Sequence, residues 1–106
     1  MSEAGNQELA HQVRQALRQV VDPELGQNVV DLGLVYAVSV SDGCVASIRM
    51  TTTTRGCPAT EFLRQAVEDR AWSVAGIEFV DVALTYDPPW SPALIAPEIA
   101  GLLGSR

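Results

Sequence analysis

The order of hydrophobic patterns along the chain constrains its fold most strongly. Apolar residues recur at helical spacing over residues 7–21 and 58–74, and they alternate with polar residues over 34–40, 44–50 and 79–86. The first pattern is typical of helices with one buried face, and the second of strands with one buried face. Helices laid on one side of paired strands form a two-layer sandwich. We therefore expect an α+β fold, with helices packed on one face of a small mixed sheet.

Each predicted element has an expected buried side and an expected end. The helical stripes are Leu9, Val13, Leu17 and Val20, and then Phe62, Leu63, Ala66, Val67, Ala71 and Val74. The strands should bury Leu34, Tyr36, Val38 and Val40, then Cys44, Ala46, Ile48 and Met50, then Val80, Val82, Leu84 and Tyr86. Pro23 should stop the first helix at the residue before it. Two short helices are expected over residues 92–95 and 97–103, each beginning with proline.

Length and charge narrow the class of protein. The 106 residues suit a single domain, 1–106, in which residues 1–6 should be flexible. The net charge of -6 disfavours nucleic acid or an anionic membrane as the main partner. No run approaches the roughly 18 apolar residues of a membrane span, and the N-terminus lacks the pattern of a signal peptide. We expect a cytoplasmic protein.

The best candidate for chemistry is Cys57, which directly precedes Pro58. Proline favours the first helical position, so Cys57 is expected at the N-cap, where unpaired N–H groups and the helix dipole favour a thiolate. Arg55 could add a positive charge, and Gly56 allows close approach of the backbone. The hydroxyl of Thr54 could bond a sulfur, a ligand or its own backbone. The alternative is an inert helix cap, and spacing alone does not separate the two.

The chain holds too few ligands for a metal centre of its own. Structural zinc sites and iron–sulfur clusters usually take four Cys or His ligands, whereas this sequence offers Cys44, Cys57 and His11. Cys44 is expected in the core, as the first residue of a strand. A site shared across a dimer, or completed by a partner's thiol, fits the count. A cysteine-nucleophile enzyme needs a base beside Cys57; because His11 is expected on an exposed helix, we do not expect an enzyme.

Two proline loops carry the remaining candidates. The first holds Asp22 and Glu24, and the second holds Asp87 and Trp90. The carboxylates could supply oxygen ligands or partner contacts near Cys57, or they could simply cap turns. Trp90 could lie over the site, anchor another protein or plug the loop. The residues alone leave these alternatives open.

Three sequence blocks resemble those of a known family. They are DPELGQNVVDLGLVY at 22–36, MTTTTRGCP at 50–58 and DPPWSP at 87–92. Together they are similar to the signature blocks of the metal–sulfur cluster assembly factors, which include PaaD-like and SufT-like bacterial proteins and the eukaryotic cytosolic iron–sulfur targeting factor. The resemblance covers about residues 13–103. It implies a domain of the iron–sulfur cluster assembly type, with Cys57 as the functional thiol.

The resemblance also implies a function and partners. Such proteins help to mature iron–sulfur proteins by contacting assembly proteins or client apoproteins. We expect a non-catalytic assembly or targeting factor that forms a homodimer, with Cys57 as a transient ligand for iron or an iron–sulfur cluster shared between chains. The alternatives are a metal-free adaptor that docks on a client oxygenase or assembly protein, and a thiol redox enzyme. The cysteine-rich C-terminal segment of PaaD proteins is missing here, so a dedicated role in that oxygenase is not expected.

Overall fold

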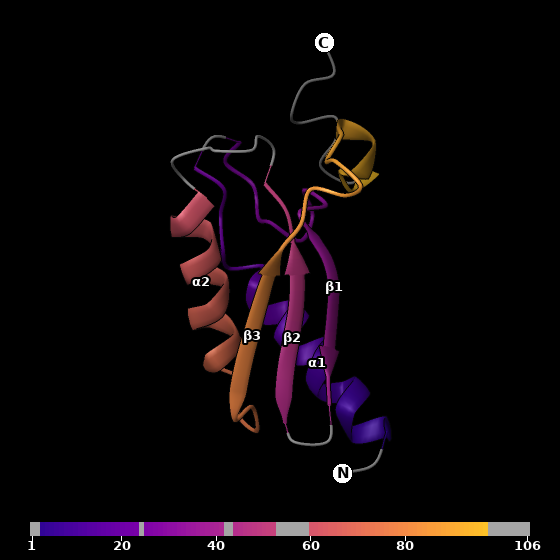
Figure 1. Cartoon of the computed structure of the whole chain (residues 1–106), viewed down its shortest axis with the longest axis vertical. Coiled ribbons are helices and arrows are strands. Elements are labelled where there is room, and N and C mark those ends of the chain that lie inside the picture. The colour runs from indigo at the N-terminus through magenta and orange to yellow at the C-terminus, as the bar shows by residue number, and fades with distance from the viewer. Residues whose placement is uncertain (1–2, 24, 42–43, 53–59, 98–106) are drawn as a thin grey trace.

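The computed structural model describes residues 3–23, 25–41, 44–52 and 60–97. Its elements are, in chain order, helix α1 (Glu3–Leu17), strands β1 (Val35–Val40) and β2 (Val45–Met50), helix α2 (Thr60–Trp72), strand β3 (Phe79–Leu84) and a short 3-10 helix (Pro92–Leu94) (Figure 1). The predicted order of helix, two strands, helix and strand is confirmed. Among the described residues, no helix is long and apolar enough to cross a membrane.

The three strands form one mixed sheet in the order β1-β2-β3. β1 and β2 run antiparallel, whereas β3 runs parallel to β2. A parallel pair needs a crossover connection, and α2 lies in that connection. α1 packs against β1, α2 packs against β3, and the two helices also contact each other (Figure 1). The predicted α+β sandwich with a mixed sheet is therefore confirmed.

Aliphatic side chains form the core between the sheet and the helices. Alternate residues of β2 point into it, as predicted, and so do parts of both helical stripes. The buried residues from these elements are Val13, Leu17, Ala46, Ile48, Met50, Leu63, Val67 and Ala71. The prediction is wrong for Phe62, whose side chain is 60% exposed. Because successive helix residues are about 100° apart, Phe62 lies well round the helix from the buried line through Leu63 and Val67.

The first helix starts and ends earlier than its hydrophobic pattern suggests. It begins at Glu3, so residues 3–6 belong to the helix. Its end tightens, because the N–H groups of residues 18–20 donate to carbonyls three residues back instead of four. The helix therefore ends at Leu17, ahead of the stop predicted from Pro23. Val21 is instead extended, in an antiparallel bridge with Asn28.

Two irregularities modify the first two predicted strands. A register shift between Val35 and Ala37 interrupts the alternation of β1, so Leu34 and Val35 are both buried. Cys44 precedes β2 instead of starting it, and its side chain is only half-buried. It has a φ of 59° in the turn between β1 and β2, where its N–H donates to the carbonyl of Ser41. The prediction of a core strand position for Cys44 is therefore wrong.

The last predicted elements are confirmed in part. β3 ends at Leu84, two residues before the predicted end at Tyr86. Its inward side is the predicted one, with Val80 buried and Val82 half-buried. The 3-10 helix Pro92–Leu94 occupies the place of the first predicted short helix. The second one, and the predicted start of α2 at Pro58, lie outside or at the limit of the described residues.

Candidate functional site

Three segments far apart in the sequence meet at one end of the sheet. The parallel strands β2 and β3 finish at this end, and β1 begins there because it runs antiparallel to β2. The N–H of Thr51 donates to the carbonyl of Leu34 at 2.8 Å, and the N–H of Thr85 donates to that of Met50 at 2.9 Å. We call this region, residues 28–36, 50–52 and 84–90, the loop end (Figure 1). It contains described parts of all three sequence blocks.

A hydrogen bond of Trp90 connects the third sequence block to the first. Its Nε1 donates to the carbonyl of Leu32 at 2.7 Å, and its half-buried ring packs against the hydrophobic core. Nearby, the hydroxyl of Tyr36 donates to the carbonyl of Pro88 at 2.7 Å. These contacts are those of a side chain that plugs its loop, which is one of the alternatives that the sequence left open. A binding role for Trp90 stays a prediction.

Asp31 joins the end of α1, the first block and the C-terminal segment. Its carboxylate forms an ion pair with Arg18 at 2.9 Å and accepts a hydrogen bond from Asn28 Nδ2 at 3.0 Å. Its own N–H donates to Asn28 Oδ1 at 2.9 Å, and its carbonyl accepts from the N–H of Ala96 at 2.7 Å. Asp31 thus orders the loop before β1. Asp31 was not among the predicted site residues, although a single carboxylate inside the apolar run 29–32 was an available signal.

Two buried threonines lead from β2 toward the segment that carries Cys57. Thr51 and Thr52 are 0% and 3% exposed. The hydroxyl of Thr51 donates to the carbonyl of Thr52 at 3.3 Å, and the hydroxyls of Thr52 and Tyr86 share a hydrogen bond of 2.9 Å. Buried hydroxyls need such partners, because their desolvation is otherwise uncompensated. The described residues at the start of this segment are therefore connected by a hydrogen bond to the chain that follows β3.

Asp22 is built into the turn of the first block. It is 2% exposed, and its Oδ1 accepts a hydrogen bond from the N–H of Leu25 at 3.1 Å. Its carbonyl accepts from the N–H of Gly26 at 2.8 Å, and its N–H donates to the carbonyl of Gln27 at 2.9 Å. Gly26 supplies a positive φ of 72°, which most side chains resist. This is the turn-capping geometry that the sequence offered as the alternative to a ligand role.

Asp87 has a different environment. Its side chain is exposed, while its backbone is held by the hydroxyl of Thr85, which accepts from the N–H at 3.2 Å and donates to the carbonyl at 3.3 Å. The peptide bond from Asp87 to Pro88 is cis. Of the two predicted carboxylates that the structure describes, Asp87 is therefore the one accessible to a partner or a ligand.

The other predicted site residues lie outside the described part of the chain: Glu24, Thr54, Arg55, Gly56 and Cys57. Around Cys57, the structure describes the chain up to Thr52 and again from Thr60. Among the described residues, no group of three or more His, Cys, Asp and Glu side chains could hold a metal ion. That finding does not extend to Cys57 or Glu24.

Cys44 lies away from the loop end. Cys44 directly precedes β2, whereas the loop end lies beyond the other end of this strand. A six-residue strand spans about 20 Å, since each residue advances the chain by about 3.3 Å. His11 is exposed on α1, as predicted. Cys44 is therefore unsuited to share a ligand set with residues at the loop end of the same chain.

Comparisons with known proteins identify the family. The chain matches the family model described as "Iron-sulfur cluster assembly protein" over residues 10–84. The chain belongs to this family. The chain is 39% identical over 88 residues to an "Fe-S protein maturation auxiliary factor" of Porphyromonas gingivalis, over 83% of this chain and 84% of the relative. It is 36% identical over 83 residues to the "Fe-S protein maturation auxiliary factor YitW" of Bacillus subtilis, over 78% and 81% of the two chains.

A solved structure agrees with the assignment. The crystal structure of a domain of unknown function, DUF59, from Bacillus anthracis matches this chain with a TM-score of 0.92 and 30% sequence identity, over 99% of this chain and 100% of that one. The family predicted from the three sequence blocks is thus confirmed. The family match covers the first two blocks, whereas the third block, with Asp87 and Trp90, follows it along the chain.

Proposed function

We propose that this protein helps to mature iron–sulfur proteins without itself catalysing a reaction, and that Cys57 is the residue on which this role depends. The observation that carries the proposal is the meeting of all three sequence blocks at the loop end, from which the segment with Cys57 continues after Thr52. Membership of the family and the names of the two relatives, both maturation auxiliary factors, support the same role.

The length of chain supports a place for Cys57 near this end. Cys57 follows Thr52 by five residues and precedes Thr60 by three. A chain spans at most about 3.6 Å per residue, so the Cα of Cys57 lies within about 18 Å of that of Thr52 and about 11 Å of that of Thr60. Tyr86, hydrogen-bonded to Thr52, leads directly to the exposed Asp87. The chain length therefore allows the thiol and this carboxylate to contact one bound cargo.

The chemistry that fits is weak, incomplete ligation of a passing cargo. Iron–sulfur clusters are usually held by four thiolates, and each chain offers Cys57 alone at this end. A second copy of the chain in a homodimer, or a client protein, would supply the others. A cargo held by few ligands is readily released, as delivery requires. Asp87 and Glu24 would add oxygen ligands, whereas Asp22 is already engaged in its turn.

The maturation role and the part of Cys57 in it are tested together in cells. Deleting this chain from its host should lower the cluster occupancy of iron–sulfur proteins, measured by electron paramagnetic resonance of reduced extracts. Wild type and Cys44→Ser should restore the signal, and Cys57→Ser should not. Full restoration by Cys57→Ser would remove the cysteine from the account. An unchanged signal in the deletion strain would remove the maturation role itself.

A second candidate function is a metal-free adaptor, which the exposed aromatic side chains Phe62, Trp72 and Phe79 favour. Large aromatic residues on a surface are typical anchors of protein partners. The two functions differ in what chelation does to the binding of a client. An adaptor keeps every contact with its client in the presence of a strong iron chelator. A carrier loses the contact that is made through the shared metal and keeps only contacts made elsewhere on its surface.

A further inference from the structure

The aromatic residues of this protein are distributed unusually. All six lie within the described ranges, and none belongs to the buried core, which is aliphatic. Three of them are strongly exposed: Phe62 at 60%, Trp72 at 43% and Phe79 at 56%. Single exposed apolar residues are common, but exposed aromatic rings gathered on one side of a small domain mark an interaction surface.

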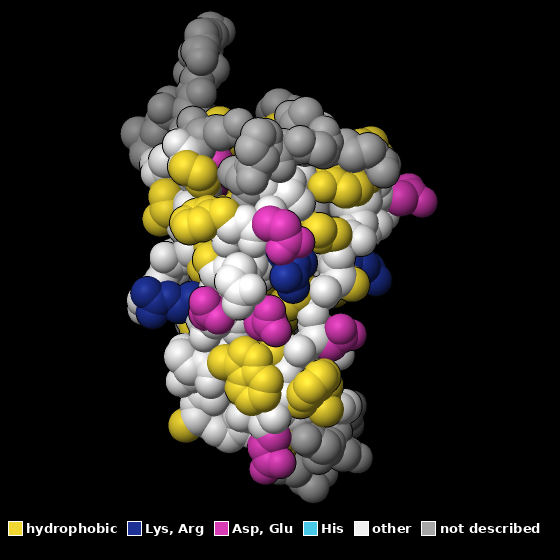
Figure 2. Space-filling view, turned by 60° about the vertical axis from the view of Figure 1, so that its left-hand side comes forward, with side chains coloured by type: hydrophobic (Ala, Val, Ile, Leu, Met, Phe, Trp, Pro, Cys, Tyr) yellow, Lys and Arg dark blue, Asp and Glu magenta, His cyan; other side chains and the backbone are white. Residues whose placement is uncertain are grey.

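These three residues lie near the two ends of the exposed side of α2. Phe62 lies in the first turn of the helix and Trp72 is its last residue, about 15 Å further along at 1.5 Å per residue. The ring of Trp72 meets that of Phe79, the first residue of β3, edge to face at a centroid distance of 6.2 Å. Figure 2 looks onto this side and shows hydrophobic side chains above and below a central group of charged ones.

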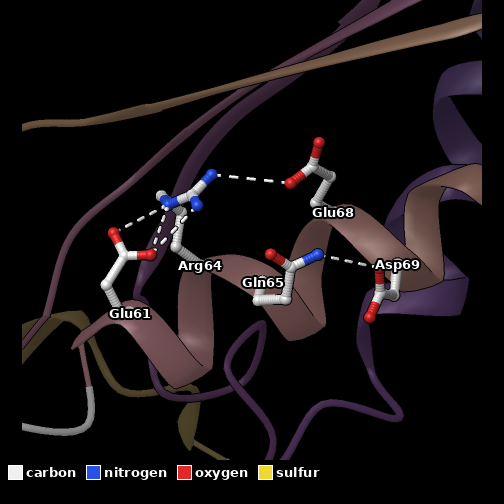
Figure 3. Close-up of polar contacts among 5 residues, drawn as sticks. All are labelled: Glu61, Arg64, Gln65, Glu68 and Asp69. Carbon is white, nitrogen blue, oxygen red and sulfur yellow. Dashed lines mark hydrogen bonds and ion pairs between the residues drawn. The ribbon is translucent and has the colours of Figure 1, made fainter.

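The charged group between the aromatic residues is predominantly acidic. Arg64 is held by Glu61 at 3.0 Å and by Glu68 at 3.5 Å, and Asp69 accepts a hydrogen bond from Gln65 at 3.0 Å (Figure 3). The hydrogen bond and charge of Arg64 lower the pKa of Glu61 below its ordinary value. Arg64 therefore already pairs with two carboxylates, and its positive charge does not balance the negative charge of Asp69.

Acidic side chains also flank the aromatic pair. Glu78 directly precedes Phe79, and Asp81 follows it by two residues on the same, outward side of β3. Within the described ranges, no arginine forms an ion pair with Asp69, Glu78 or Asp81. We call the side of the molecule formed by residues 61, 62, 64, 65, 68, 69 and 72 of α2 and residues 78, 79 and 81 around β3 the α2 face. It is apolar at both ends and predominantly acidic between them.

We propose that the α2 face docks a partner protein through a basic segment that also carries apolar side chains. The cationic groups of that segment lie over Glu68 and Asp69, and its apolar groups contact Phe62 at one end and Trp72 with Phe79 at the other. Buried aromatic anchors inside a polar rim are the usual energetic centre of a protein interface. Opposite charge on the partner speeds the encounter and fixes the register.

The charge of this face also decides against other occupants. Two copies meeting through their α2 faces would bring Asp69, Glu78 and Asp81 against the same residues, and like charges across an interface are costly. A phosphate backbone or an anionic membrane is disfavoured for the same reason. Docking on the α2 face uses none of the residues of the loop end, and it does not use the thiol of Cys57.

Photo-crosslinking identifies the occupant. p-Benzoylphenylalanine replaces Gln65 on the α2 face, and in a matched strain it replaces Gln15, which is exposed on α1. After irradiation of cells, mass spectrometry of the digested adducts shows which segment was bound. The proposal expects adducts at position 65 but not at 15, to a segment of another protein that contains arginine or lysine beside apolar residues. Adducts mainly to a second copy, to an acidic segment, or equally at both positions would overturn it.

The affinity of the purified pair then tests the chemistry. Trp72→Ala should weaken binding about thirtyfold, as a truncated anchor does, and Phe62→Ala, which removes a mostly exposed ring and so leaves the fold intact, about fivefold. Asp69→Arg should weaken it about tenfold, with a loss that shrinks at high salt. Glu8→Arg is the matched control, because Glu8 accepts the same kind of hydrogen bond from Gln12 on the exposed side of α1.

Two results of the affinity measurement would contradict docking on the α2 face. One is a dissociation constant for Asp69→Arg and Phe62→Ala that stays within twofold of the Glu8→Arg value. The other is a loss of binding in Cys57→Ser alone, which would place the contact at the thiol. If instead Cys57→Ser binds normally and fails to support maturation, the α2 face and the proposed role of Cys57 are both upheld as separate features.

Discussion

Anaerobic reconstitution with iron and sulfide should load the Cys57→Ser variant with about tenfold less metal than wild type, because a serine oxygen replaces a soft thiolate ligand poorly. The change removes the one sulfur that the proposed site draws from each chain. It alters no side chain of the described core, so the circular dichroism spectrum and the melting temperature should stay close to those of wild type. Iron and acid-labile sulfide per chain are the quantities to measure.

Cys44→Ser is the matched control for this experiment. Cys44 is half-buried and sits at the opposite end of β2 from the loop end. Its variant should load as much iron and sulfide as wild type. Equal loading of Cys57→Ser and wild type would rule out the ligand role, and a loss in Cys44→Ser of the same size would point to non-specific thiol binding.

Gly33→Ala should destabilise the fold by about 3 kcal/mol, because two separate penalties act on one added methyl group. Gly33 has a φ of 78°, a conformation that resists a side chain. A Cβ built there would also clash with the carbonyl oxygen of Leu94 and approach its Cβ to 2.7 Å. The backbone of the C-terminal segment would have to move away, which weakens the hydrogen bond between Trp90 and Leu32. Thermal unfolding should show a fall of roughly 10 °C or more.

Gly26→Ala separates the two penalties. Gly26 has a similar φ of 72°, but no described atom lies within 4 Å of a Cβ built on it. Gly26→Ala should lower the free energy of unfolding by only about 1 kcal/mol, which is the cost of placing a side chain in this backbone conformation. The close approach of Gly33 to Leu94 would be contradicted if both variants unfolded at the same temperature. A shifted indole N–H signal of Trp90 in Gly33→Ala alone would confirm that the C-terminal segment moves.

Most of the secondary structure could be predicted from the sequence, because local patterns determine it. The alternation Ala46, Ile48 and Met50 gave the buried face of β2 correctly, and the line through Leu63 and Val67 gave that of α2. The errors arose where a local pattern competes with a specific backbone geometry. The tightened end of α1, the register shift in β1 and the turn at Cys44 are all of this kind.

The site was harder to predict than the fold. The three sequence blocks identified the family, and the parallel arrangement of β2 and β3 explains why they meet. The contacts that join them are pairings between distant residues, such as Thr52 with Tyr86 and Trp90 with Leu32. No spacing within either segment indicates such a pairing. The exposure of Phe62 could not be predicted either, because a helical stripe alone does not show how wide the buried face is.

The most direct test of the central claim, that Cys57 holds a passing iron–sulfur cargo, is the visible absorption spectrum of protein purified without oxygen from cells. Wild type and Cys44→Ser should show the broad absorbance of an iron–sulfur chromophore, which a strong iron chelator removes. Cys57→Ser should be colourless. A Cys57→Ser spectrum that matches wild type in shape and intensity per chain would contradict the claim.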